Sequence, residues 1–235
     1  MREKFQISDF RFQISNFRYQ SFLQVCCLLT SIFCLLTPVF SSLAADTPLL
    51  AELQKSLSGT TNVQSEFIQE KTLSLLQQTV VIKGRLAVEQ PTRLSWQVLE
   101  PIRYNMVLDG TVLKQWDETT GKVQTMSLAG NPVFKVVVNQ LRAWFSGQFD
   151  LLTQDFDARA DASTSTPTII FTPKEGSFAV KVIQRVVLTF REDRRYIQTL
   201  LIEERTGDRT LMTFTQSILN AAIPPSAWEV KPHGR

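Results

Sequence analysis

Apolar and polar positions alternate along most of the chain. In residues 93–98, Leu94 and Trp96 are apolar and their immediate neighbours are mostly polar, and Met106 and Leu108 repeat the alternation. This period of two predicts strands that present one apolar face. Turn-forming residues separate such runs at 109–110, 120–121, 174–176, 192–193 and 206–208. Regular hairpins of this kind predict one antiparallel sheet.

Two segments depart from this alternation and predict helices. Thr47 is suited to cap a helix, Pro48 suits its first position, and Gly59 ends the apolar periodicity that follows. Between residues 132 and 149, apolar residues recur at helical spacing and predict a central helix. Between the first helix and the hairpins, residues 63–71 alternate and predict an edge or entry strand.

These elements predict a mainly β fold of the α+β kind. Two helices are too few to cover both faces of a long antiparallel sheet, so the sheet must curl, closing wholly or partly into a barrel with the helices over its open side. The pattern alone leaves open whether the interior is packed solid or hollow.

The N-terminal segment has a composition of its own. Basic residues precede an apolar run over 22–40, and small residues follow it. This order predicts a signal peptide at residues 1–44, cleaved after Ala44 or alternatively after Ala45, and a single exported domain at residues 45–235. An uncleaved membrane anchor is the competing interpretation, because such a run nearly spans a hydrocarbon layer of ~30 Å.

A near-duplication precedes the apolar run. Residues 5–11 read FQISDFR and residues 12–18 read FQISNFR. A signal peptide does not require this repeat, so we expect that the true translation start lies downstream of Met1.

Charge and composition exclude several classes of function. The formal charge is only +3, which argues against a nucleic-acid partner. The cysteines lie before residue 35 and the single histidine is His233, so disulfides, Cys/His metal sites and histidine-based triads are not expected in the body. Paired carboxylates such as Glu203 and Glu204 are typical of a solvated face. We therefore expect neither an enzyme nor a bound cofactor.

An ordered set of short motifs resembles the periplasmic outer-membrane lipoprotein carrier protein family. Each motif is weak alone, but together they cover nearly all of the body in the right order. The motifs are Phe67–Gln69, Gly84–Leu86, Pro91–Trp96, Pro101, Val107–Leu113, Trp116–Asp117, Asn131–Phe134 and Thr172–Lys174.

The resemblance implies a single strongly curved antiparallel sheet that forms an incomplete β-barrel, with an apolar cavity covered by helices that act as a lid. It implies a periplasmic, monomeric carrier that takes a lipoprotein from an inner-membrane transporter, shields its acyl chains and hands it to an outer-membrane receptor. Such a carrier performs no turnover chemistry, in agreement with the composition.

The resemblance also suggests where the cargo binds. We expect an acyl-chain site formed by Leu94, Trp96, Met106 and Leu108 from the sheet and by Phe134, Val137 and Leu141 from the central helix. In the family an arginine before the motif's proline holds the lid shut, whereas this chain has Gln90. By strand parity Gln90 shares a face with Leu94, so its side chain can donate hydrogen bonds to lid carbonyls. Because it is uncharged, this latch should be weaker than the arginine latch by ~1 kcal/mol.

Three functions are compatible with the sequence. The first is lipoprotein carriage between the two membranes. The second is carriage of another acylated lipid or glycolipid, which the departure at Gln90 favours. The third is a module that binds lipoproteins without transporting them, which an uncleaved N-terminal anchor would favour.

Overall fold

A single sheet dominates the computed structural model, which describes residues 47–128, 139–140, 143–153, 155–161 and 166–231. All of these belong to one compact unit, Ala44–Arg235. The sheet has 11 antiparallel strands in the order β6-β5-β4-β3-β2-β1-β11-β10-β9-β8-β7. The prediction of a mainly β protein built on one antiparallel sheet is therefore confirmed.

The strands range from 5 to 12 residues in length and follow one another closely along much of the chain. The strands are β1 Asn62–Leu73, β2 Gln78–Glu89, β3 Arg93–Glu100, β4 Tyr104–Asp109, β5 Val112–Asp117, β6 Val123–Ser127, β7 Phe156–Asp161, β8 Thr168–Pro173, β9 Ile183–Phe190, β10 Ile197–Glu204 and β11 Arg209–Leu219. The helix α2 spans Thr47–Ser58, and 3-10 helices lie at η2 Phe149–Leu152, η3 Ala179–Lys181 and η4 Pro225–Trp228. All of the predicted turn sequences fall between or directly after strands.

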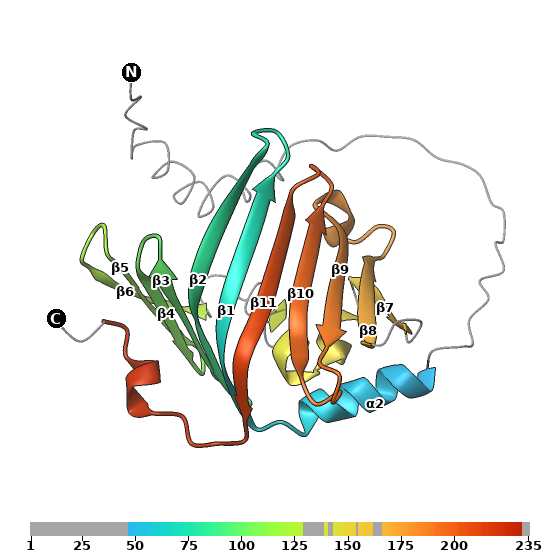
Figure 1. The fold of residues 1–235 in the computed structure, drawn as a ribbon, viewed down its shortest axis with the longest axis horizontal. Helices are drawn as coiled ribbons and strands as arrows, with labels where there is room; N and C mark the ends of the chain where they lie inside the picture. Colours follow the sequence, from blue (N-terminus) through green and yellow to red (C-terminus); the bar gives the residue numbers. More distant parts are fainter. Residues whose placement is uncertain (1–46, 129–138, 141–142, 154, 162–165, 232–235) are drawn as a thin grey trace. The chain divides into compact units, whose positions relative to one another are not determined.

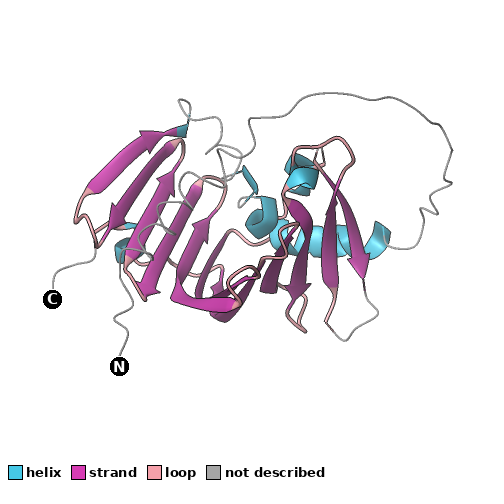
Figure 2. Cartoon of the chain, turned by 90° about the horizontal axis from the view of Figure 1, so that it is seen from above, coloured by secondary structure: helices cyan, strands magenta, loops and turns pink. Residues whose placement is uncertain are grey.

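The sheet remains open, since β6 and β7 form its two edges (Figure 1). Seen from above, the strands follow an arc (Figure 2). This is the incomplete barrel that the family resemblance implies. The expectation that residues 63–71 form an edge strand is wrong, because β1 lies at the centre, paired with both β2 and β11. The polar residues of β1 either lie on the solvent side of the sheet or form hydrogen bonds. For example, Ser65 Oγ lies 2.6 Å from Ser217 Oγ.

The concave face of the arc carries the core. Register places Phe67 of β1 opposite Gly84 of β2, and Gly84 opposite Val98 of β3. The Phe67 ring packs over the glycine, with its centroid 4.6 Å from that of Trp96. A Cβ at Gly84 would lie 2.4 Å from Phe67 Cζ and 2.2 Å from the Gln97 carbonyl oxygen, so only glycine fits.

Helix α2 lies below the lower ends of β8–β10 in Figure 1. It forms where the sequence predicts, and it ends where the Gly59 N–H donates to the Lys55 carbonyl. The side chains of Leu53 and Leu57, one turn apart, are completely buried in the core. The apolar stripe read from the sequence is thus the face that packs on the sheet.

A second helical segment includes residues 139–140 and 143–146. It ends before Gly147, earlier than the predicted end at Phe149, because Gly147 adopts a φ of +70°. A Cβ there would lie 2.8 Å from both the Gln54 carbonyl oxygen and Leu57 Cβ. Close packing on α2 therefore ends this helix, and Phe149 begins η2 instead. We call α2, residues 143–146 and η2 the helical cover.

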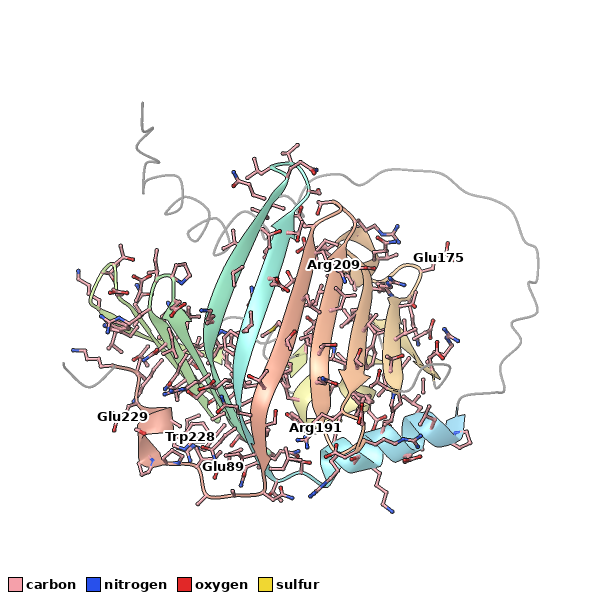
Figure 3. All side chains as sticks on the ribbon, in the orientation of Figure 1. Glu89, Glu175, Arg191, Arg209, Trp228 and Glu229 are labelled. Atoms are coloured by element: carbon pink, nitrogen blue, oxygen red, sulfur yellow. The ribbon has the colours of Figure 1, made fainter. Side chains whose placement is uncertain are left out.

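The C-terminal tail lies on the convex face. Gln97 Nε2 donates to the Ala227 carbonyl at 3.3 Å, and the Arg93 guanidinium lies 4.0 Å from the centroid of the Trp228 ring. Arg93 also pairs with Glu89 at 2.7 Å, and Figure 3 shows Glu89 and Trp228 close together. Tail and sheet enclose a pocket of about 450 Å³ on this outer side.

Among the residues described, no helix has the length and apolar character needed to cross a bilayer.

Candidate functional site

The sheet residues predicted to bind acyl chains all project from the concave face. Leu94 pairs with Leu108, and Trp96 pairs with Met106 in the next row. Leu94 and Leu108 are buried in the packed core at 2% and 0% exposure, whereas Trp96 and Met106 are only partly buried against it. The structure thus brings these residues together, with Trp96 and Met106 the more accessible pair.

The helix residues predicted for the site, Phe134, Val137 and Leu141, lie outside the described residues. From the same region, Trp144 and Phe145 are buried against the sheet at 6% and 1% exposure. The Phe145 ring meets that of Phe214 edge-on, with centroids 5.5 Å apart. This end of the central helix therefore contacts the concave face.

A pocket of about 250 Å³ lies between α2 and the β7 end of the sheet. Its apolar lining centres on an aromatic cluster, in which the Phe171 centroid lies 5.1 Å from that of Phe149 and 6.5 Å from that of Phe156. At its polar rim, Lys174 Nζ donates to the Thr153 carbonyl at 2.7 Å. The remaining lining residues are Leu50, Gln54, Asp150, Leu152, Asp157 and Ala158.

Sequence reasoning did not find this pocket. None of the predicted acyl-site residues lines it, because it lies at the opposite wing of the sheet from β3 and β4. Phe156 and Ala158, and likewise Ile169 and Phe171, stand two positions apart in their strands. This spacing could have revealed the pocket wall, since it places all four residues on the concave face.

Gln90 lies where a lid latch is expected. Its Nε2 donates to the Thr60 carbonyl at 2.5 Å and more weakly to the Leu57 carbonyl at 3.4 Å. Its backbone N–H also donates to the Thr61 carbonyl at 2.9 Å. The glutamine thus fastens the C-terminal end of α2 to the sheet without a charged donor.

Three further contacts, which sequence reasoning missed, hold the helical cover. In the β9–β10 turn, the Arg194 carbonyl accepts a hydrogen bond from Ser56 Oγ at 2.7 Å, and its guanidinium pairs with Glu52 at 3.2 Å. The Tyr196 hydroxyl donates to the Phe145 carbonyl at 3.1 Å. Complete burial raises the pKa of the Tyr196 phenol above its usual range, so it stays protonated as the donor.

The structure thus presents an apolar concave face, and hydrogen bonds hold the helical cover against it. The family model described as "Outer membrane lipoprotein carrier protein LolA" matches residues 58–231. The chain belongs to the LolA family. The resemblance inferred from the short motifs is thereby confirmed.

Individual proteins are also similar to this chain in sequence or in structure. The chain is 22% identical over 196 residues to an outer-membrane lipoprotein carrier protein of Ralstonia nicotianae, covering 81% of this chain and 86% of the relative. A LolA superfamily protein of Nitrosomonas europaea is similar in structure with a TM-score of 0.42 and 10% identity, over 79% of this chain and 98% of that one.

The Mycobacterium tuberculosis lipoprotein LppX gives a TM-score of 0.44 at 12% identity, over 77% of this chain and 99% of that chain. The open half-barrel described above is the LolA-like fold, and family membership makes it a lipoprotein-carrier fold.

Proposed function

We propose that this protein carries acylated lipoproteins through the periplasm from an inner-membrane donor to an outer-membrane acceptor. The observation that carries the proposal is the family match over residues 58–231, on a half-barrel whose concave face is apolar and covered by helices. In this proposal the protein acts as a monomer, performs no chemical turnover, and reaches the periplasm through a cleaved signal peptide.

The energetics of cargo binding agree with a carrier. Each buried methylene contributes roughly 0.8 kcal/mol, so one long acyl chain gains on the order of 10 kcal/mol before costs. Cargo must displace the cover, whose Leu53, Leu57 and Phe145 side chains are almost fully buried. Exposing three such side chains costs roughly 5–9 kcal/mol.

These opposing free energies are of the same order. Cargo binding is therefore close to balanced against closure of the empty protein, as passive transfer to an acceptor requires. The fastening points at Gln90, Arg194 and Tyr196 adjust this balance, because each stabilises the covered state only.

The test is native mass spectrometry of the protein isolated from the periplasm, followed by transfer to acceptor membranes. We expect a bound species with the mass of an acylated lipoprotein, released when outer-membrane receptor is supplied. A protein that carries no acyl species and takes none from lipoprotein-loaded inner membranes would overturn the proposal.

A second candidate is carriage of another acylated lipid or glycolipid. The observation that favours it is the uncharged latch, since Gln90 stands where the family has an arginine. The same mass spectrometry separates the two, because a glycolipid would appear as a bound mass without a polypeptide component.

A further inference from the structure

A ladder of polar side chains crosses β4, β5 and β6 on the otherwise apolar concave face. The Tyr104 hydroxyl donates to Gln115 Oε1 at 2.9 Å, and Gln115 Nε2 donates to Gln124 Oε1 at 2.8 Å. Gln115 lies opposite Met106 on one side and opposite Gln124 on the other, so all of these residues share the concave face.

The ladder leads from the rim of the sheet into its interior. Gln124 is exposed on the edge strand, Tyr104 is half-buried, and Gln115 is only 5% exposed. Leu113, two residues before Gln115 and on the same face, is completely buried together with its partner Leu108. The concave face thus changes from apolar to polar within a single residue row, about 7 Å along the strand.

Packing alone does not require an amide at this position. A buried amide is unfavourable relative to an apolar side chain unless it is hydrogen-bonded, and leucine already fills the neighbouring row. Gln115 is satisfied by lateral partners, which orient its amide along the face. An amide offers both a donor and an acceptor, which is the chemistry that recognises ester and amide groups.

We propose that the Tyr104–Gln115–Gln124 ladder binds the ester and amide linkages of an N-terminally acylated peptide while its acyl chains lie on the apolar rows beside Leu108 and Leu113. This inference rests on the proposed function and adds a specificity determinant to it. The ladder distinguishes acyl chains joined to a polypeptide from hydrocarbon that lacks carbonyl groups.

The test compares two fluorescently monitored ligands on the purified protein. One is a synthetic peptide whose N-terminal residue carries ester- and amide-linked palmitoyl chains, and the other is N-phenylnaphthylamine, an apolar probe without carbonyls. We expect Gln115→Leu to weaken lipopeptide binding about 5- to 10-fold, the loss typical of one hydrogen bond, and to leave the apolar probe within about 2-fold.

Gln97→Leu is the matched control, because Gln97 lies on the convex face of β3 and bonds the C-terminal tail. It should change neither affinity. Tyr104→Phe removes one hydroxyl and keeps the ring, so it tests the same ladder if Gln115→Leu fails to fold. We expect it to lower lipopeptide binding selectively as well.

Equal losses for both ligands, or no loss in either ladder variant, would overturn the inference while leaving the carrier function intact. If the wild-type protein binds the apolar probe but not the lipopeptide, the inference and lipoprotein carriage both fail. If it binds neither, the apolar site itself is refuted.

Discussion

Replacing Gln90 by leucine removes the side-chain part of the latch on α2. The amide makes one short hydrogen bond to the Thr60 carbonyl at 2.5 Å, and its contact to the Leu57 carbonyl at 3.4 Å adds little because Thr60 N–H already donates there at 3.0 Å. The backbone bond from Gln90 N–H to the Thr61 carbonyl remains. The variant therefore loses about one net hydrogen bond, which lowers the free energy favouring the closed state by ~1 kcal/mol.

That free energy corresponds to an approximately 5-fold larger open population. Hydrogen exchange of the α2 amides measures it directly, because these amides exchange when the cover opens. We expect an approximately 5-fold faster exchange in α2 and unchanged exchange in β9 and β10. Gln90→Arg should slow it, since a charged donor forms a stronger bond.

Gln64→Leu is the control for the latch, because Gln64 Nε2 donates to the Ala222 carbonyl at 3.2 Å, away from the cover. It should leave α2 exchange unchanged. If α2 exchanges at the wild-type rate in Gln90→Leu, the side chain does not restrain the cover and the latch hypothesis is refuted.

Three further variants test other parts of the molecule. Trp96→Glu places a charge on the accessible part of the concave face and should abolish lipopeptide uptake with the fold retained, as measured by binding and circular dichroism. Gly84→Ala puts a Cβ 2.2 Å from the Gln97 carbonyl oxygen and should destabilise the protein by about 3 kcal/mol in thermal melts. Tyr196→Phe loses the bond to the Phe145 carbonyl and should reduce stability by ~1 kcal/mol at neutral pH. Because burial raises the folded-state pKa of Tyr196, its stabilising contribution is complete below about pH 10 and is lost as pH rises further, so the phenylalanine variant should lose less stability at alkaline pH.

Each variant has its own control and contrary outcome. Leu99→Glu lies on the exposed convex face of β3 and should bind lipopeptide normally, so equal loss in both variants would contradict the site. Gly110→Asn occupies an open left-handed turn and should melt like the wild type. Identical alkaline unfolding of the wild type and Tyr196→Phe would show that this phenol is not protected by burial.

Local signals in the sequence predict much of the fold. The capping residues place α2 correctly, and the alternation over residues 93–98 assigns the faces of β3. The position of β1 was not predictable in this way, because alternation reveals which face a residue occupies and not which strand lies beside it. The β1–β11 pairing joins opposite ends of the body, so no short segment contains its signal.

The residues of the candidate site likewise fall into those predictable from local sequence and those that depend on contacts between distant segments. Gln90 and Trp96 were predictable because they belong to or adjoin one short motif, with Gln90 in the turn directly after β2 and Trp96 on β3. Tyr196 and Arg194 were missed because their roles depend on a turn that meets the cover from a distant part of the chain. Phe149 was missed for a related reason, since it enters the pocket from a 3-10 helix that begins only where Gly147 ends the preceding helix.

The central position of β1 and β11 has a consequence for how the protein assembles. Within β1–β6, and likewise within β7–β11, strands pair with their sequence neighbours, so each half forms a meander from local contacts. The two meanders meet along one seam, from the Val63–Leu219 pair to the Thr72–Arg209 pair. Forming this seam requires closure of the long loop between Thr72 and Arg209, which makes it the slow step of folding and the line along which the halves would first separate under force.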